Sequence, residues 1–308
     1  MTEPAFISNL TFVVFTYNEE ARLPLVIRNL KKYGSILVVD NYSSDSTLEI
    51  ARSYGCRALM NRNEGGWMEN QETCDNVQGA VATDWMFWLS ADELISSDAL
   101  VELGRLIESD KYDVISMLRK NYFQGVFCHN IAIGYRARAF KKNCIDFRGN
   151  TIHNFGKITS SPKRVIKMHS KYYIHHLISN TTTSYIDTIQ RYTEMEKVNR
   201  DHGQMTRSTA YAMLVPFKAI LIDYFFKGGR KAGRSALHLS LLMLIYSFIK
   251  VIKGYDVQEG LTAEVIALCN RRIAEDILRQ LPGKPVQPET DSIGEIGAEP
   301  SNSGTGEA

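Results

Sequence analysis

Two acidic side chains, Asp92 and Glu93, close the stretch FWLSADE at the end of an apolar run. Carboxylate oxygens are the ligands that hard divalent cations prefer, and Mg²⁺ is usually held by one or two carboxylates together with substrate phosphates. This acidic strand end is therefore suited to Mn²⁺ or Mg²⁺ beside a diphosphate. Ser90 stands two residues before Asp92, and its hydroxyl can still bind ribose or a metal-bound water, without charge.

Two further polar clusters follow the first two apolar runs of the chain. Thr16, Tyr17 and Glu19 follow the first run, and Asp40 and Asn41 follow the second. In parallel α/β sheets, ligands bind beyond the carboxyl ends of the strands, where these clusters would meet. One cluster alone is typical of a turn, but three on one edge favour a ligand site. A tyrosine can stack on a base, and a carboxylate can accept hydrogen bonds from ribose or a base.

The elements that position these clusters alternate between strands and helices. Apolar runs predict strands at 11–16, 35–40, 56–60 and 84–90, and helical spacing predicts helices between them, the last over 67–82. Ser43 or Ser44 is expected to cap the second helix. Strands are also expected at 112–118 and 131–139, and a helix at 185–203. This rhythm predicts an α/β fold with a mainly parallel sheet.

Composition narrows the class of protein. The chain has 308 residues, a net charge of +2 and five cysteines. An odd number of cysteines without a CxxC pair argues against a disulfide framework or a zinc site and favours a reducing cytosol. No signal peptide and no phosphate-binding glycine loop are recognisable. The stretch 282–308 holds one lysine and five acids, four of the eight prolines and few large apolar residues, which predicts a disordered acidic tail.

The region after residue 206 is strongly apolar and carries a basic segment, KGGRKAGR, at 227–234. Residues 236–249 are apolar on nearly every face, yet no run reaches the ~20 apolar residues of a spanning helix. Two alternatives stay open. This region is the core of a helical subdomain, or it lies in a membrane interface with the basic segment on anionic lipid headgroups.

Four segments together resemble the nucleotide-sugar half of family 2 glycosyltransferases, which have the GT-A (Rossmann-like) fold. They are FTYNEEARLPLVIRNL, VVDNYSSDSTLEIA, Gln71 and DWMFWLSADE. The segment YYIHHLISNTTTSYIDTIQRYTEME and the apolar C-terminal region resemble the corresponding parts of small bacterial enzymes that extend lipopolysaccharide core and other surface glycans. The resemblance covers about residues 10 to 255.

The resemblance implies an inverting transfer of a sugar from a nucleotide-sugar donor, most readily a UDP-sugar, to a lipopolysaccharide-core or other lipid-linked acceptor. It implies a GT-A domain over 1–205, a membrane-proximal helical extension over 206–281 and the tail over 282–308. The enzyme would be cytoplasmic, peripheral to the inner membrane and without a nucleic-acid partner. Asp92 would hold the cation, and the donor would be bound by Thr16, Tyr17, Glu19, Asp40, Asn41, Gln71 and Ser90.

The sequence departs from the family pattern at two positions. The motif Asp-Ala-Asp-Glu reads Ser-Ala-Asp-Glu here, and the residue after His153 is Asn154 where the family has Glu. Because asparagine cannot act as a general base, His153, with an ordinary pKa of ~6.5, becomes the nearest candidate. Asp146 and one of His175 and His176 are further candidates.

Two other functions compete with an active transferase. The first is a binding protein with a glycosyltransferase fold that has lost catalysis, with Ser90 and Asn154 as the marks of that loss. The second is a nucleotidyltransferase, which the absence of glycine from FTYNEE disfavours.

Overall fold

The computed structural model describes residues 6–63, 67–129, 131, 133–150, 154–178, 181–198 and 209–280. The chain divides into two compact units, Met1–Glu259 and Gly260–Ala308. Within the described residues, the first unit holds two sheets and the helices α1 to α7, and the second holds helix α8 (Ala263–Arg279). His153, the predicted boundary at 205/206 and the predicted tail lie outside the described residues.

Strands and helices alternate up to β4 as expected, and the second half is richer in short strands than expected. The strands are β1 (Leu10–Thr16), β2 (Ser35–Asp40), β3 (Arg57–Met60), β4 (Trp85–Ser90), β5 (Glu93–Ile95), β6 (Val114–Phe123), β7 (Val126–Phe127), β8 (Gly134–Lys141), β9 (Ile145–Asp146), β10 (Lys157–Ile158), β11 (Val165–Lys167) and β12 (Tyr173–Leu177). The helices of the first unit are α1 (Leu23–Leu30), α2 (Thr47–Ser53), α3 (Gln71–Ala80), α4 (Ser97–Glu108), α5 (Thr182–Val198), α6 (Thr209–Phe225) and α7 (Gly233–Gln258).

The main sheet has the strand order β3-β2-β1-β4-β8-β6-β12-β5. Its first four strands are parallel, and every residue of β1 is buried, as an apolar strand covered on both faces requires. Thr16 pairs with Asp40 and Phe15 with Ser90, so the three polar strand ends meet at one edge. The prediction of an α/β GT-A domain with a mainly parallel nucleotide half and C-terminal helices is confirmed.

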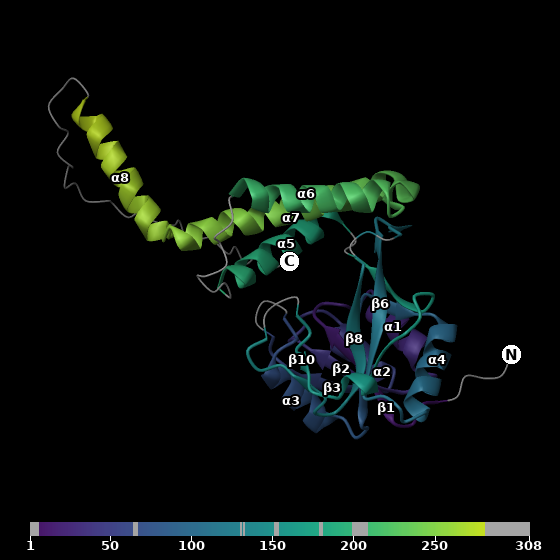
Figure 1. Ribbon diagram of the computed structural model, residues 1–308. Helices are drawn as coiled ribbons and strands as arrows, with labels where there is room; N and C mark the ends of the chain where they lie inside the picture. Colours follow the sequence, from purple (N-terminus) through teal and green to yellow (C-terminus); the bar gives the residue numbers. More distant parts are fainter. Residues whose placement is uncertain are drawn as a thin grey trace, which may run out of the picture. The chain divides into compact units, whose positions relative to one another are not determined.

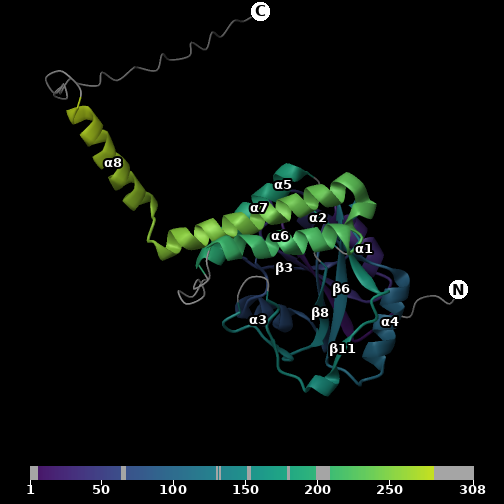
Figure 2. The ribbon, with the colours of Figure 1, turned by 45° about the horizontal axis from the view of Figure 1, so that its top comes forward.

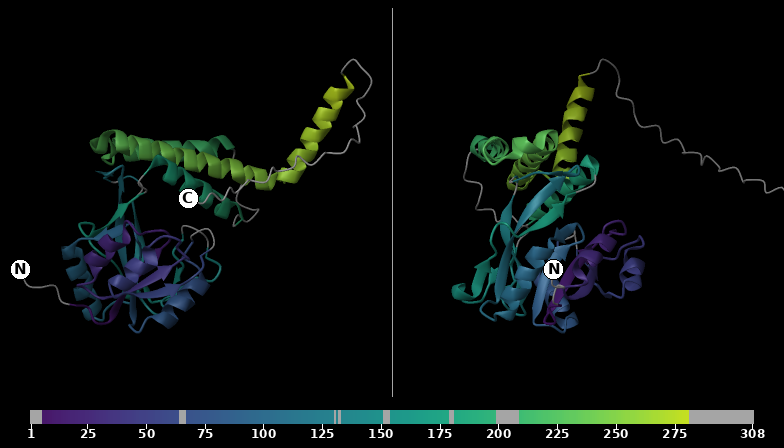
Figure 3. Two further views of the ribbon diagram at one scale, coloured as in Figure 1. Left: turned by 180° about the vertical axis from the view of Figure 1, so that it is seen from behind. Right: turned by 90° about the vertical axis from the view of Figure 1, so that its right-hand side faces the viewer.

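Two apolar cores cover the two faces of this sheet (Figure 1). On one face, α1, α2 and α4 pack against the strands through residues such as Ile27, Ala51 and Leu103. On the other face, α3 and the segment after β8 pack around Trp88, which stacks on Phe147 with ring centroids 5.2 Å apart. The left view of Figure 3, from behind, shows helices on both sides of the strands. Helix α4 was not predicted, although its buried face has ordinary helical spacing.

The second half of the sheet mixes directions. Strand β8 lies antiparallel between β4 and β6, and β12 runs parallel to β6. The pairing of β6 with β8 shifts between Ile115 and Ser116, since Ile115 faces Ala139 but Ser116 faces Ala137. One extra residue on β8, Arg138, therefore forms a β-bulge.

The helix cap predicted at Ser43 or Ser44 is wrong. Helix α2 begins at Thr47 after Ser46, and Ser43 instead donates its backbone N–H and its hydroxyl to Asp40. A buried carboxylate at the end of β2 competes for the hydroxyl that would otherwise cap the helix.

Helices α5, α6 and α7 gather at one end of the sheet, with α6 and α7 side by side (Figure 2). A third core joins Ile189 of α5 and Leu239 of α7 to Phe123 at the end of β6. The expectation that this region falls short of spanning length is wrong. Among the described residues, one helical stretch, Gly229–Gln258, is long and apolar enough to cross a membrane, and 22% of its most apolar window is buried.

Candidate active site

A cleft of about 1190 Å³ opens where the carboxyl ends of β1 and β4 meet strands β6, β8 and β12 and helices α5 and α7. Most of the predicted site residues line it. These are Thr16, Tyr17, Glu19, Asn41, Ser90 and Asp92. Asp40 and Gln71 lie outside the lining, and His153 lies outside the described residues.

The turn after β1 is held by hydrogen bonds to the loop after β2. Asn18 adopts a left-handed conformation with φ of 54°, which asparagine tolerates better than most residues. Its backbone N–H donates to the Ser43 hydroxyl (2.8 Å), and its side-chain oxygen accepts from the Ser44 N–H (2.8 Å). Tyr17, next to this anchored residue, stays 54% exposed in the cleft, where its ring is free to stack on a ligand.

Asp40 is fully buried, and its carboxylate is occupied by the protein itself. It accepts hydrogen bonds from the Thr16 hydroxyl (2.8 Å), the Ser43 hydroxyl (2.6 Å) and the Ser43 N–H (2.8 Å). Asp40 thus fixes the two loops behind the cleft, and its contact with base or ribose stays a prediction. Asn41, the next residue, lines the cleft and exchanges two hydrogen bonds with the backbone of Asn63.

Gln71 begins α3 and is engaged on both sides of its amide. Its nitrogen donates to Asp75 (2.8 Å), and its oxygen accepts from the Phe147 N–H (3.0 Å). The contact orders the segment after β8 against α3. A role of Gln71 in donor binding stays a prediction.

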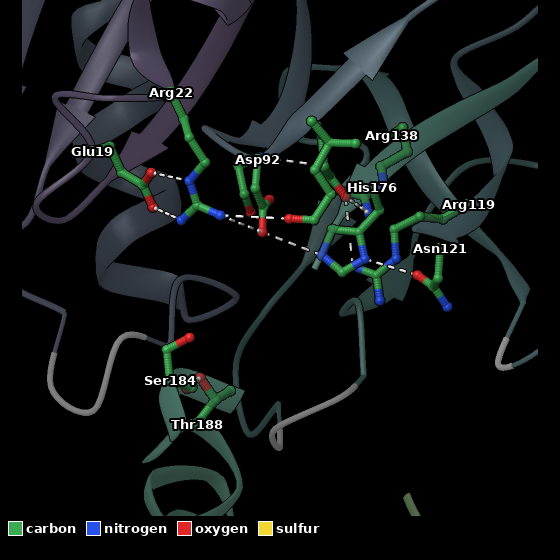
Figure 4. A network of polar contacts seen from close by, with 12 residues as sticks. Glu19, Arg22, Asp92, Arg119, Asn121, Arg138, His176, Ser184 and Thr188 are labelled. Carbon is green, nitrogen blue, oxygen red and sulfur yellow. Dashed lines mark hydrogen bonds and ion pairs between the residues drawn. The ribbon is translucent and has the colours of Figure 1, made fainter. Parts of the chain in front are cut away.

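Asp92 lies in the cleft among basic groups (Figure 4). One of its oxygens lies 3.3 Å from Nε2 of His176 and 3.8 Å from Arg22. The other oxygen, Oδ1, is buried and has no hydrogen-bond partner among the described residues. Burial alone would raise the pKa of Asp92, but the charges of His176, Arg22 and Arg119 lower it to about 2. Asp92 is therefore a carboxylate throughout the physiological range, and its buried Oδ1 lacks a hydrogen-bond partner among the described residues.

Glu19 is the partner of Arg22 rather than an unoccupied acid. The guanidinium of Arg22 donates to both carboxylate oxygens of Glu19, at 2.6 and 2.5 Å. Burial raises the pKa of Glu19, and the ion pair with Arg22 partly offsets this effect. The pair links the turn after β1 to Asp92.

Glu93 is structural. Its side chain is 1% exposed, receives two hydrogen bonds from Arg138 (2.8 and 3.1 Å) and accepts the Ser90 N–H (3.0 Å). Arg119 lies 3.5 Å away. Because an unpaired buried carboxylate is costly, this pair locks the end of β4 to the bulge of β8. Burial lowers the pKa of Arg138, and Glu93 counters that effect.

The resemblance implies a divalent cation. The residues present fit a cation that receives only few of its ligands from the protein. No group of three His, Cys, Asp or Glu side chains in the described part of the chain could enclose a metal ion. The unpartnered Oδ1 of Asp92, with the Ser90 hydroxyl also lining the cleft, fits instead a cation that takes one carboxylate and draws its remaining oxygens from phosphate and water.

The other candidates for the general base differ in whether they line the cleft. A hydrogen bond and the charge of Arg148 lower the pKa of Asp146 to about 2, and Asp146 is not part of the cleft lining. His175 bonds the Tyr122 hydroxyl (2.8 Å) outside the cleft lining. His176 lines the cleft, and its Nδ1 contacts Asn121 (2.8 Å). Only one histidine of the pair faces the site, as strand alternation requires.

Sequence reasoning missed the basic side of the cleft. Its described members are Arg22, Arg119, Arg136, Arg138, Arg191 and Lys250. A partial signal exists in YRARA (135–139), where arginines recur two residues apart on an expected strand. The remaining members lie on elements far apart in the sequence, and only the fold brings them together.

The family model described as Glycosyl transferase family 2 matches residues 11–170. An uncharacterised glycosyltransferase of Rickettsia typhi is 29% identical over 104 residues, which cover 33% of this chain and 34% of that protein. The chain thus matches about a third of the length of that relative.

Among solved structures, residues 1–349 of TarS from S. aureus in complex with UDP give a TM-score of 0.42 at 14% identity, covering 83% of this chain and 93% of that one. A mannosyltransferase from Pyrobaculum calidifontis, in complex with GDP-Man and Mn²⁺, gives 0.44 at 13% identity, covering 87% and 80%.

Proposed function

Because the chain belongs to glycosyl transferase family 2, we propose that it is an inverting glycosyltransferase. It would move a sugar from a nucleotide-sugar donor to a glycan or lipid-linked acceptor. The observation that carries this proposal is the unpartnered Oδ1 of Asp92 in a large cleft, beside the joined ends of β1 and β4.

The donor would bind along the edge formed by the turns after β1 and β2. Tyr17 offers an exposed ring for a base, and the Asn41 side chain lies close by in the same cleft. The resemblance favours a UDP-sugar. The hydrogen bonds of Asn18 and Asp40 hold this edge in place before a ligand arrives, which reduces the entropy lost on binding.

A divalent cation held at Asp92 would supply Lewis-acid neutralisation of the departing diphosphate. The residues of the chain have separate tasks. Asp92 presents a carboxylate oxygen, while Arg22 and His176 hold its other oxygen and so fix its direction. Glu93 and Arg138 hold the end of β4 beneath it. Fixed charges of this kind stabilise developing charge without reorganisation.

The acceptor would enter between β6, β8 and the helices α5 and α7. Its hydroxyl must lose a proton as the sugar transfers. His153 remains the proposed base from the sequence, since Asp146 is bound by Arg148 away from the cleft lining.

The alternative, a binding protein that has lost catalysis, is not favoured. Ser90 removes one charge from the motif, yet Asp92 lines the cleft and keeps an oxygen without a hydrogen-bond partner among the described residues. The two readings differ in donor turnover. Purified protein would be incubated with UDP-, GDP- and ADP-sugars and Mn²⁺, and release of nucleoside diphosphate would be measured. We expect release with one class of donor. Nucleotide binding without release would support the alternative, and absence of both would reject a donor site.

We also infer that the protein is peripheral to the cytoplasmic face of the inner membrane. The support is chemical. Helices α6 and α7 expose large apolar side chains, among them Leu214 (63%), Phe225 (52%) and Ile252 (54%), and the basic segment 227–234 lies between the two helices in the chain. Apolar surface flanked by basic residues suits an anionic interface.

The membrane proposal is tested with vesicles that contain anionic lipid. Neutralising Lys227, Arg230, Lys231 and Arg234 should reduce sedimentation with these vesicles and make it insensitive to salt. Unchanged sedimentation would remove the electrostatic part of the proposal, and absence of binding by the unaltered protein would remove the whole of it.

A further inference from the structure

Three arginines in the cleft have no carboxylate of their own among the described residues. Arg136 and Arg191 are exposed and form no ion pair within the described ranges. Arg119 is 38% exposed and lies 3.5 Å from Glu93, whose two oxygens already accept from Arg138, and its charge also acts on Asp92. Positive charge therefore remains uncompensated on this side of the cleft.

Two other basic side chains of the cleft already form ion pairs with carboxylates of the protein. Arg22 is bound to Glu19 through two hydrogen bonds, and Lys250 lies 2.9 Å from Glu196. The carboxylates of Glu19 and Glu196 thus largely neutralise the positive charges of Arg22 and Lys250. The three arginines without a carboxylate of their own lie on β6, β8 and α5, whereas Tyr17 and Asn41 follow β1 and β2.

Arg119 and Arg136 project from the same face of adjacent strands. In the antiparallel pairing, Arg136 faces Met117, and Arg119 follows Met117 by two residues. Diagonal neighbours of this kind have Cα atoms about 7–8 Å apart, within reach of two long side chains converging on one group. Both residues line the cleft.

A buried donor beside them also lacks a partner. Arg138 lies on the same strand, its side chain is 9% exposed, and it lines the cleft. Two of its nitrogens serve Glu93 and the carbonyl of Trp88, but its Nε has no hydrogen-bond partner among the described residues. Buried polar groups are normally satisfied, so such an atom calls for a ligand or an ordered water.

We propose that Arg119 and Arg136 form an anion-binding pair in the acceptor half of the cleft, so that the acceptor is a sugar bearing a phosphate or carboxylate group. This inference rests on the proposed function and names its acceptor class. Guanidinium groups bind both oxyanions through paired N–H donors. Across the cleft, α5 presents Ser184 and Tyr185, a hydroxyl and a ring of the kind that bind neutral parts of a sugar.

The test measures binding of simple probes to the full chain with saturating nucleoside diphosphate and Mn²⁺ present, so that the donor site is filled. The probes are a hexose 6-phosphate, a hexuronic acid and the neutral hexose. The binding of each is measured by ligand-observed NMR. We expect one charged sugar to bind and the neutral one to bind at least about tenfold more weakly, as loss of a charge-assisted contact implies. Raised salt should weaken the charged probe alone.

Arg136→Gln should weaken the charged probe by about tenfold and leave the neutral sugar unchanged. Arg105→Gln, an exposed arginine of α4 outside the cleft lining, is the matched control and should change neither. The phosphate and carboxylate probes decide which anion is read.

Three results would overturn the inference: equal binding of charged and neutral sugars, no effect of Arg136→Gln, or competition between the charged probe and the nucleotide. The last would assign the pair to the donor diphosphate. Nucleoside diphosphate binding is followed in the same titration. Its absence would defeat the proposed function, whereas its presence with no charged-sugar binding would defeat the acceptor inference alone.

Discussion

The two halves of the cleft are built differently. At the nucleotide edge, polar side chains satisfy one another: Asp40 accepts three hydrogen bonds, and Asn41 and Asn63 exchange two. On the side proposed for the acceptor, Arg119 and Arg136 project from adjacent strands; Arg119 shares Glu93 with Arg138, and Arg136 forms no ion pair among the described residues. The first half is held in place by its own hydrogen bonds before a ligand arrives. In the second half, guanidinium N–H donors remain that no protein carboxylate uses among the described residues. Sequence motifs therefore report the first half well and the second poorly.

The largest effect is expected where the halves are joined. Arg138→Leu leaves Glu93 buried without its main partner, and we expect a loss of about 3–5 kcal/mol of unfolding free energy in chemical denaturation. Arg105→Leu removes an equally bidentate but exposed pair with Glu102 and should cost much less, because solvent screens an exposed pair. Adding Glu93→Gln to Arg138→Leu should recover part of the loss. Equal losses of unfolding free energy in Arg138→Leu and Arg105→Leu would mean that the buried Glu93–Arg138 pair stabilises the fold no more than an exposed ion pair does.

Asp92→Asn tests the nucleotide half at its catalytic end. We expect transfer to fall by at least about 1000-fold, since a fixed charge at the diphosphate is removed. Asp98→Asn, at the exposed start of α4, should leave transfer unchanged. Nearly normal kcat in Asp92→Asn would exclude Asp92 from the reaction.

The same substitution carries a pH signature. The folded-state pKa of Asp92 is about 2, below the ~3.9 of an unfolded aspartate, so its carboxylate stabilises the fold above pH ~4 and loses that effect as the pH falls toward 2. The unaltered protein should have a larger unfolding free energy than Asp92→Asn above pH ~4, and this difference should shrink between pH 4 and 2. A difference independent of pH would show that the charge at Asp92 is not what the fold stabilises.

Asp40→Asn separates structure from recognition at the nucleotide edge. The amide would face donors that the carboxylate now accepts, so we expect a loss of about 1–3 kcal/mol in stability. Weaker nucleotide binding without any loss of stability would instead restore Asp40 as a ligand contact.

The smallest effect is expected at Tyr17. Because its ring is half exposed, Tyr17→Ala should change stability by less than about 0.5 kcal/mol. It should weaken nucleotide binding by about tenfold, the range of a stacked base, while Tyr17→Phe keeps the ring and the affinity. Equal affinities for the two variants would remove the stacking role.

The buried strands of the nucleotide half were predictable because their signal is local. An apolar run ending in polar residues identifies β1, β2 and β4, and the parallel arrangement then joins their ends. The direction in which those polar side chains point could not be predicted from the local sequence. Whether Asp40 faces the ligand or the Ser43 loop depends on which donors the neighbouring turn supplies.

The basic side depended on sheet order that no single segment contains. Strand β8 sits between β4 and β6, so Arg138 meets Glu93, which lies 45 residues earlier in the chain. The pair Glu19–Arg22 was different, since a three-residue spacing at a helix start already indicates contact. Helix α4 was missed although its apolar spacing was regular.

The β-bulge at Arg138 determines which residues of β8 can reach a substrate. If the pairing of Ile115 with Ala139 continued without a shift, Arg136 would face Leu118 and its side chain would lie on the opposite side of the sheet from Arg119. One inserted residue thus brings the two guanidinium groups to a common side. In that unshifted register, Ala137 would face Met117 and Tyr135 would face Arg119, so this side of the sheet would present an alanine and a tyrosine beside Arg119 in place of the second guanidinium group.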